Sequence, residues 1–428
     1  TSDLNKEGLT MGYTENLIDF IGKSTDCYHA VKTAKDRLDE NGFTELFEGD
    51  KWEVQSGGKY YVIRNSSSII AIEMPKKDFG AFMICASHTD SPSFKLKPDF
   101  EINADGCIKL SVEGYGGMIM SSWLDRPLSI SGRIVTAKNG KIETKLVNLD
   151  RNLLVIPSLA IHMSRDINKG YEFNIRRDMC PIASEKNGRI EDIIAENVGV
   201  DKEEILGFDL SLYNRMRGTV LGADGEYFSA PRIDDLQCMY STLEGFLNSE
   251  SDDNVTVFAA FDNEEVGSGT KQGAKSSFLR DVLERICNNS ETYKRAVAKS
   301  FMLSCDNAHA VHPNFADKSD GTNRVYMNGG IVIKYNANQR YTTDAVSEAV
   351  VKYVCKNAGV PYQMYANRSD IPGGSTLGNL SNEKVSLNTA DIGLAQLAMH
   401  SSYETAGSRD TEYMVKMIKE FYKTEIVL

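Results

Sequence analysis

The stretch from Val255 to Glu265 reads Val-Thr-Val-Phe-Ala-Ala-Phe-Asp-Asn-Glu-Glu, a mainly apolar run that ends in carboxylates. Such runs are typical of strands buried on both faces of a parallel sheet. Two other runs end in a similar way: residues 81–85 lead into Ser-His-Thr-Asp at 87–90, and residues 301–305 lead into Asp306. Ligands bind beyond the carboxyl ends of strands in open parallel sheets, so we expect these three strand ends to converge.

Two kinds of pattern alternate along the chain and predict two domains. Residues 1–98 and 226–428 combine helical apolar spacing with buried strand runs, which predicts an α/β domain with three layers, α/β/α. Residues 99–225 instead contain short alternating strands separated by the turn pairs Asp105-Gly106 and Asn139-Gly140. We therefore expect a β-rich domain inserted into the α/β domain.

Composition and charge narrow the possible functions. The 428 residues include 60 acidic and 48 basic side chains, a net charge of -12, which argues against nucleic acid because phosphate binding needs a basic surface. No segment reaches the roughly 18 apolar residues of a membrane helix, and the polar opening lacks the apolar run of a secretory signal. The eight scattered cysteines contain no C-x-x-C pair, so we expect reduced thiols and a cytoplasmic protein.

Taken singly, the residues at the three strand ends have ordinary explanations. A carboxylate-rich loop such as 262–265 is usually a solvated turn, His88 is more often a hydrogen-bonded loop histidine, and Asp306 could cap a helix. Two more segments strengthen the case for a site. Asp234 precedes an apolar helix pattern, and His400 is one of only six histidines in the chain. Together these residues predict a cluster of imidazole and carboxylate groups, which are suitable zinc ligands.

Five motifs, in chain order, resemble those of the aspartyl aminopeptidase / aminopeptidase I family of metallopeptidases. They are His88-Thr89-Asp90-Ser91-Pro92, Arg232-Ile233-Asp234-Asp235, Asp262-Asn263-Glu264-Glu265-Val266-Gly267-Ser268, residues 306–314, and Met399-His400-Ser401. The likeness runs from near residue 15 to near residue 425. It implies a zinc-peptidase-like catalytic domain, aminopeptidase activity and a homo-oligomer, for which the family precedent is a dodecamer, with the inserted domain serving oligomerisation.

The resemblance also implies a role for each residue of the cluster. Two divalent ions are implied. His88 would bind one ion and His400 the other, and Asp234 would bridge the two. Glu265 and Asp306 would each add a carboxylate to one ion. Glu264 would be the general base, and Asp90 would accept the imidazole N–H of His88. We expect zinc, with cobalt and manganese as alternatives that accept the same ligands.

The implied reaction is removal of the first residue from a peptide with a free N-terminus. Two bound ions would lower the pKa of a shared water and polarise the scissile carbonyl, and Glu264 would take the proton of that water. His162 resembles a family histidine that reaches the active site across a subunit boundary, where it would bind substrate or stabilise the oxyanion, with a direct metal contact as the lesser alternative.

Lys334 and Gly374 are the remaining substrate-side candidates. Lys334 matches a family lysine near the substrate side-chain pocket, although a lysine that ends an alternating strand is usually exposed. Gly374 lies in the segment 371–378, where glycine lets the main chain approach a ligand. Many acid-specific members carry a cysteine near Gly373 that this chain lacks, so acidic, neutral and apolar first residues all remain open.

Two other functions fit part of the pattern. A two-metal deacylase of N-acyl amino acids would use the same centre, but it would accept acylated substrates that an aminopeptidase cannot. A catalytically silent, metal-bound scaffold would need no general base, so the presence of Glu264 argues against it.

Overall fold

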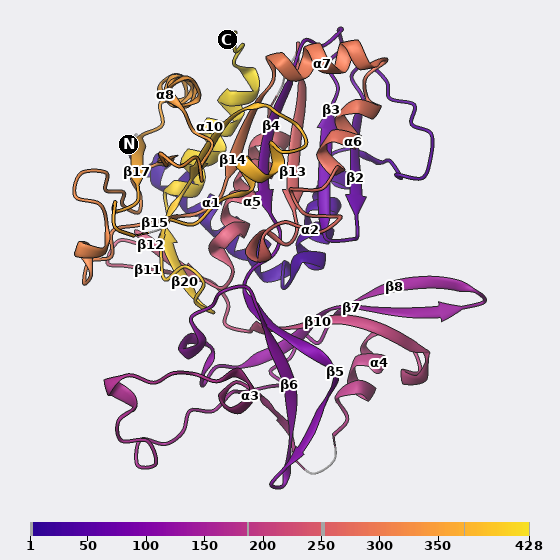
Figure 1. Ribbon diagram of the computed structural model, residues 1–428, viewed down its shortest axis with the longest axis vertical. Coiled ribbons are helices and arrows are strands. Elements are labelled where there is room, and N and C mark those ends of the chain that lie inside the picture. Colours follow the sequence, from indigo (N-terminus) through magenta and orange to yellow (C-terminus); the bar gives the residue numbers. More distant parts are fainter. Residues whose placement is uncertain (1–2, 186–187, 250–252, 372, 428) are drawn as a thin grey trace. The chain divides into compact units, whose positions relative to one another are not determined.

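The computed structural model describes residues 3–185, 188–249, 253–371 and 373–427 (Figure 1). The chain divides into two compact units. The first comprises Thr1–Asp90, Gly218–Met399 and Glu404–Leu428, and the second comprises Ser91–Arg217 and His400–Tyr403. These limits differ from the expected 99 and 225. The insertion begins earlier because Phe94 and Leu96 are already buried in its core.

The first unit is built on a nine-stranded sheet with the order β1-β2-β3-β13-β4-β14-β18-β16-β17. Its strands are β1 Thr44–Glu45, β2 Lys59–Arg64, β3 Ser68–Glu73, β13 Val255–Phe261, β4 Phe82–His88, β14 Phe301–Cys305, β18 Asn388–Gly393, β16 Ile331–Tyr335 and β17 Tyr362–Ala366. The central strands β13, β4, β14 and β18 are mutually parallel neighbours, and β13, β4 and β14 are buried at every position. The three apolar runs of the sequence are thus adjacent strands.

The register of these strands fixes where they end. Phe261 of β13 pairs with His88 of β4, and Ser304 of β14 pairs with Ala86 of β4. Parallel neighbours in this register deliver their carboxyl ends to one edge of the sheet. The polar residues that follow each run therefore leave the sheet side by side.

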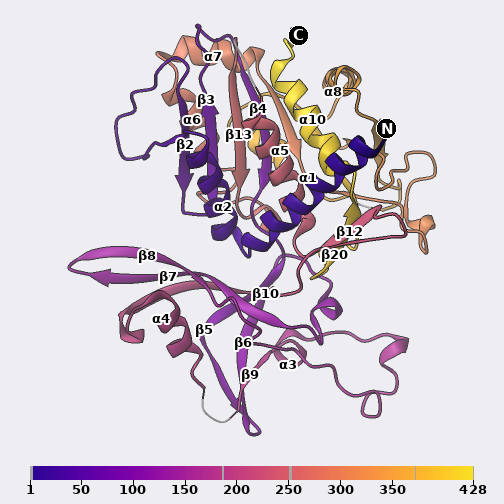
Figure 2. The ribbon, with the colours of Figure 1, turned by 180° about the vertical axis from the view of Figure 1, so that it is seen from behind.

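Helices cover both faces of the sheet. Met83 and Cys85 of β4 belong to one apolar core, whereas Ile84 and Ala86 belong to the other. The first core is closed by α1 Asp3–Lys23, α2 Cys27–Glu40, α5 Ile233–Leu247, α8 Ala345–Ala358 and α10 Asp410–Lys423, and the second by α6 Phe278–Arg285, α7 Ser290–Lys299 and α9 Leu377–Ser381. In Figure 2, which shows the sheet from behind, helices α1 and α10 lie in front of the strands. The predicted α/β/α layering is confirmed.

A smaller five-stranded sheet completes the first unit, with the order β11-β12-β20-β19-β15. Its strands are β11 Thr219–Leu221, β12 Tyr227–Ala230, β20 Glu404–Gly407, β19 Ala395–Leu397 and β15 Ala308–His309. The antiparallel ladder of β12 and β20 pairs Ala230 with Glu404. Glu404 is thereby held beside the turn that leads into α5.

The second unit is an antiparallel sheet with the order β8-β7-β10-β5-β6-β9. Its elements are β5 Ser93–Ala104, β6 Cys107–Tyr115, β7 Leu128–Lys138, β8 Lys141–Asn148, α3 Ile175–Asp178, β9 Ile182–Ser184, α4 Ile190–Val198 and β10 Ile205–Asn214. Both predicted hairpin turns form. Asp105 and Gly106 have φ values of 44° and 87°, and Asn139 and Gly140 have values of 52° and 75°, as turns with two left-handed central residues require.

Candidate metal centre

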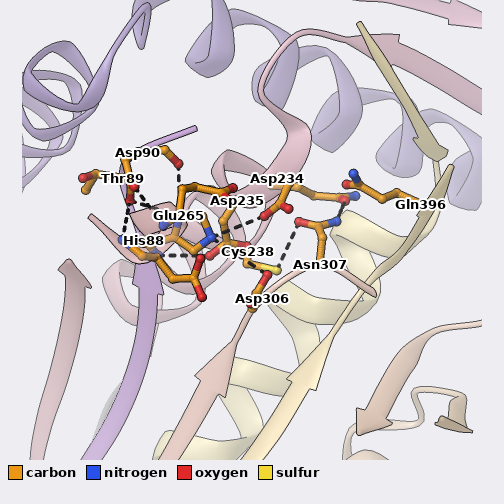
Figure 3. Close-up of polar contacts among 12 residues, drawn as sticks. His88, Thr89, Asp90, Asp234, Asp235, Cys238, Glu265, Asp306, Asn307 and Gln396 are labelled. Atoms are coloured by element: carbon orange, nitrogen blue, oxygen red, sulfur yellow. Dashed lines mark hydrogen bonds and ion pairs between the residues drawn. The ribbon is translucent and has the colours of Figure 1, made fainter. Parts of the chain in front are cut away.

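Three strand ends and one helix start bring a histidine and several carboxylates together (Figure 3). His88 is the last residue of β4, Asp306 follows β14, and Glu264 opens the short 3-10 turn Glu264–Val266 after β13. His88 Nε2 lies 3.3 Å from Asp234 Oδ1 and 3.9 Å from Asp306 Oδ1. His88, Asp234 and Asp306 are all buried. The predicted convergence of strand ends therefore occurs.

Asp234 reaches this cluster because the chain has not yet become helical there. Arg232 adopts a left-handed conformation with φ 57°, and Asp234 itself is extended, with φ -78° and ψ 108°. The peptide bond between Asp234 and Asp235 is cis. The main-chain N–H of Asp234 donates to Glu404 Oε2 at 3.0 Å. The extended conformation of this turn therefore directs the carboxylate of Asp234 toward His88.

The donor atoms are spaced as metal ligands are. Among the described residues of the first unit, two sets have all their donor atoms within 4.8 Å of one another: His88 with Asp234, Asp235 and Asp306, and His88 with Glu264 and Glu265. Imidazole nitrogen and carboxylate oxygen are the ligands that zinc takes in catalytic sites. The chemistry and spacing of these residues fit a divalent metal ion.

Asp90 organises this centre through both its carboxylate and its main chain. Its two carboxylate oxygens each accept a main-chain N–H at 3.1 Å, one from Glu264 and one from Glu265. His88 Nδ1 lies 3.0 Å from the carbonyl oxygen of Asp90 and 3.4 Å from its Oδ1. A proton on Nδ1 is thus directed to Asp90, which leaves Nε2 to face the other carboxylates. The nearest acceptor for that proton is the main-chain carbonyl oxygen of Asp90.

Crowding of like charges perturbs the titration of the cluster. Burial disfavours the charged imidazolium of His88, but the carboxylates of Asp235, Asp234 and Asp306 outweigh it and hold the pKa of His88 well above its ordinary value. Burial also raises the pKa of Glu264 well above the usual range of a carboxyl group; His88 opposes this, and Asp306 and Glu265 reinforce it. The centre therefore favours extra positive charge, supplied either by protons or by a metal ion.

Asp235 is a part of the centre to which the sequence reasoning assigned no role. It is fully buried, and its Oδ2 accepts the main-chain N–H of His88 at 3.0 Å. Burial, reinforced by Asp306 and Asp234 and opposed by His88, raises its pKa well above the ordinary carboxyl value. Only its position next to Asp234 could have suggested this contact, because the partner lies far away in the sequence.

Lys334 is buried, contrary to the usual exposure of a strand-terminal lysine. Its Nζ donates to the carbonyl oxygen of Asn307 at 2.8 Å and lies 4.0 Å from Asp306 Oδ2. Burial acts to lower the pKa of Lys334, but the carboxylate of Asp306 outweighs it and the pKa is raised. Lys334 therefore remains an ammonium ion close to the cluster.

Gly374 is exposed and lies at the edge of a cavity of about 330 Å³ in the first unit. His309, His312, Tyr365 and Arg368 also line this cavity. The lining combines main chain, aromatic rings and cationic groups. The expectation that Gly374 borders the substrate stays a prediction.

The two remaining site candidates belong to the second unit. His162 is exposed in a turn closed by the hydrogen bond from Met163 N–H to the Ala160 carbonyl oxygen, 2.8 Å long. His400 begins the four-residue segment His400–Tyr403, and its carbonyl oxygen accepts the N–H of Ile119 at 3.0 Å. The roles of both histidines therefore stay predictions.

A histidine and carboxylates gathered where parallel strands end are features of the centre of a metal-dependent hydrolase. The family profile of the aminopeptidase I zinc metalloproteases, M18, matches residues 20–422. The chain belongs to this family. It is a metalloaminopeptidase, an enzyme that hydrolyses peptide bonds, which favours the peptidase over the deacylase alternative.

Individual proteins agree with this assignment along nearly the whole chain. A probable M18 family aminopeptidase 2 of Clostridium acetobutylicum is 45% identical, over 96% of this chain and 98% of that protein. The cryo-electron microscopy structure of an Ape4 and Nbr1 complex contains a chain with a TM-score of 0.94 and 34% identity, over 97% of this chain and 86% of that one. The S. cerevisiae mApe1 dodecamer gives a TM-score of 0.84 and 28% identity, over 98% and 97%.

Proposed function

We propose that this enzyme removes the first residue of peptides at a centre of two divalent ions, with zinc as the expected metal. The proposed ligands are those that the family resemblance implies: His88, His400, Asp234, Glu265 and Asp306. The observation that carries the proposal is the position of His88 Nε2, which faces Asp234 and Asp306 from two other elements at 3.3 Å and 3.9 Å. When bound, the ions would polarise the scissile carbonyl and lower the pKa of the attacking water.

Glu264 is the proposed general base. Its carboxylate would take a proton from the attacking water and later pass that proton to the leaving amine. Its place beside His88 and Glu265, with which it forms a set of donor atoms within 4.8 Å of one another, supports this role. Asp90 supports it by position, since its carboxylate holds the main chain of both glutamates.

The adjacent glutamates should fail in different ways when each is neutralised. Glu264→Gln keeps the shape of the side chain but cannot take a proton. It should retain its metal while losing about 10²–10⁴ in kcat, the usual contribution of a general base. Glu265→Gln removes a ligand charge, so its metal content should fall and excess zinc should partly restore turnover. Elemental analysis and kcat, each with and without added zinc, measure both effects.

Glu284→Gln, a change of an exposed glutamate on α6, is the matched control and should leave both quantities unchanged. Loss of metal from Glu264→Gln together with full metal in Glu265→Gln would mean that the two roles are reversed. Full activity in both variants would place the active site elsewhere.

Lys334 and Gly374 are proposed to border the substrate, and we infer that an acidic or neutral first residue is accepted. The charge of Lys334 supports an acidic preference, because a buried ammonium ion attracts a carboxylate. Its contacts also support another possibility. Lys334 Nζ is hydrogen-bonded to Asn307 and lies 4.0 Å from Asp306, so its charge could stabilise the proposed ligand Asp306 and not contact the substrate.

Lys334→Leu separates these two possibilities. If Lys334 meets the substrate, kcat/KM for aspartyl and glutamyl anilides should fall about tenfold or more, while the leucyl anilide is affected much less. The leucyl substrate is the internal control, because the same enzyme preparation turns it over. An equal loss on all three substrates would show that Lys334 acts through Asp306.

We further propose that the enzyme is a homo-oligomer in which His162 serves the active site of a neighbouring subunit. Leu159, Ile161 and Met163 flank His162 and are 59%, 48% and 75% exposed. Exposed apolar side chains clustered in one segment mark an interaction surface, and a second copy of this chain would cover them. The similar S. cerevisiae mApe1 is a dodecamer, which supports the same assembly here.

Mixed oligomers test the role of His162. Oligomers of His162→Ala chains and oligomers of Glu264→Gln chains should each be nearly inactive. After dissociation and joint reassembly, some contacts pair an intact His162 with an intact Glu264, so part of the activity should return. The same two preparations mixed without dissociation are the control. No recovery in a verified mixed oligomer would show that His162 does not act across subunits.

Peptides with a free N-terminus are the proposed partners, and the cytoplasm is the proposed location. Within the part of the chain that the structure describes, no helix is long and apolar enough to cross a bilayer. All eight cysteines lie in that part and form no disulfide with one another, which supports a reducing compartment.

A further inference from the structure

Glu404, the first residue of β20, is a buried carboxylate that the proposed reaction does not use. It is 2% exposed, and it does not belong to the donor sets around His88 described above. A carboxylate is costly to bury unless hydrogen bonds satisfy it. Its surroundings should therefore explain why a charge is kept there.

Both oxygens of Glu404 have partners in the structure. Oε2 accepts the main-chain N–H of Asp234 at 3.0 Å, and Oε1 accepts the side-chain amide of Gln396 at 3.1 Å. Gln396 is itself buried and lies on β19, next to β20 in the small sheet. Figure 3 shows Gln396 and Asp234 on the same side of the cluster. The Glu404 carboxylate is thus bonded through Oε1 to Gln396 of β19 and through Oε2 to the main chain of Asp234.

The contact falls at a point where the main chain needs an acceptor. The first N–H groups of a helix have no partner within the helix. Asp234 precedes the regular turns of α5 and is extended, after the left-handed Arg232, so its buried N–H must find its acceptor outside the helix. The β12–β20 ladder sets the distance, because it pairs Ala230, four positions before Asp234, with Glu404. Glu404 therefore fixes the turn at the residue whose carboxylate faces His88.

We propose that Glu404 is a positioning residue of the metal centre, which orients the carboxylate of Asp234 through its main-chain N–H, and that Gln396 holds Glu404 in place. This inference rests on the proposed role of Asp234 as a ligand. Groups that orient metal ligands typically contribute about 10–100-fold to metal affinity. Glu404 should therefore affect metal binding without touching the metal.

A purely structural role is the competing explanation, and Asp410 provides a matched control for it. Asp410 is also fully buried, and its carboxylate accepts main-chain N–H groups from Asn328 at 2.6 Å and Gly330 at 3.0 Å. Neither donor belongs to the metal centre. Neutralising Asp410 therefore shows how zinc affinity and the unfolding midpoint respond when a buried carboxylate that binds main chain elsewhere in the same unit loses its charge.

The experiment measures zinc affinity of the full chain by competition with a chelator, at a temperature well below each variant's unfolding midpoint. Glu404→Gln should bind zinc about 10–100-fold more weakly than the wild-type chain. Asp410→Asn should bind zinc as the wild-type chain does, even if its unfolding midpoint falls. Excess zinc should restore part of the kcat of Glu404→Gln, which a purely structural defect would not allow.

Gln396→Leu provides a second variant if Glu404→Gln does not fold. It removes the amide that holds Glu404 but leaves the contact to Asp234, so it should weaken zinc binding in the same direction and by less. Wild-type zinc affinity in folded Glu404→Gln or, failing that variant, in Gln396→Leu would overturn this inference alone. Absence of saturable zinc binding in the wild-type chain would overturn the proposed metal centre as well.

Discussion

The parallel pairing of β13, β4 and β14 is the constraint on which the centre depends. These strands are buried at every position, so their apolar side chains fix both the neighbours and the register. Once the register is fixed, His88, Asp306 and the 264–265 turn must leave the sheet at one edge. The metal-binding chemistry is therefore a consequence of how the apolar core packs.

That packing brings like charges together, and the surrounding structure limits the cost. The carboxylates of Asp90 and Glu404 accept hydrogen bonds from main-chain N–H groups, and the ammonium group of Lys334 lies 4.0 Å from Asp306. Even so, the pKa values of Asp235 and Glu264 are raised because burial disfavours their charged forms and neighbouring carboxylates add to the effect. Divalent ions would relieve this repulsion, which gives the fold and the proposed function a common electrostatic basis.

Sequence patterns predicted the parts that depend on local periodicity. The apolar run that begins at Val255 coincides with β13, and the turns predicted at Asp105-Gly106 and Asn139-Gly140 both form. The contacts of Asp235, the burial of Lys334 and the hydrogen bond from the main chain of Asp234 to Glu404 were not predictable in this way. Each depends on a partner distant in sequence, and neither periodicity nor spacing records which buried polar groups will meet.

Calorimetric titration of chelator-treated protein with zinc, in two buffers of different ionisation enthalpy, tests the central claim most directly. The claim is that carboxylates and an imidazole, crowded at the ends of adjacent parallel strands, take up protons when metal is absent and divalent ions when it is present. Saturation at two ions per chain with net release of protons is the predicted result, because the raised pKa values of His88 and Glu264 must fall on metal binding. Saturable binding without proton release, or no saturable binding at all, would contradict it.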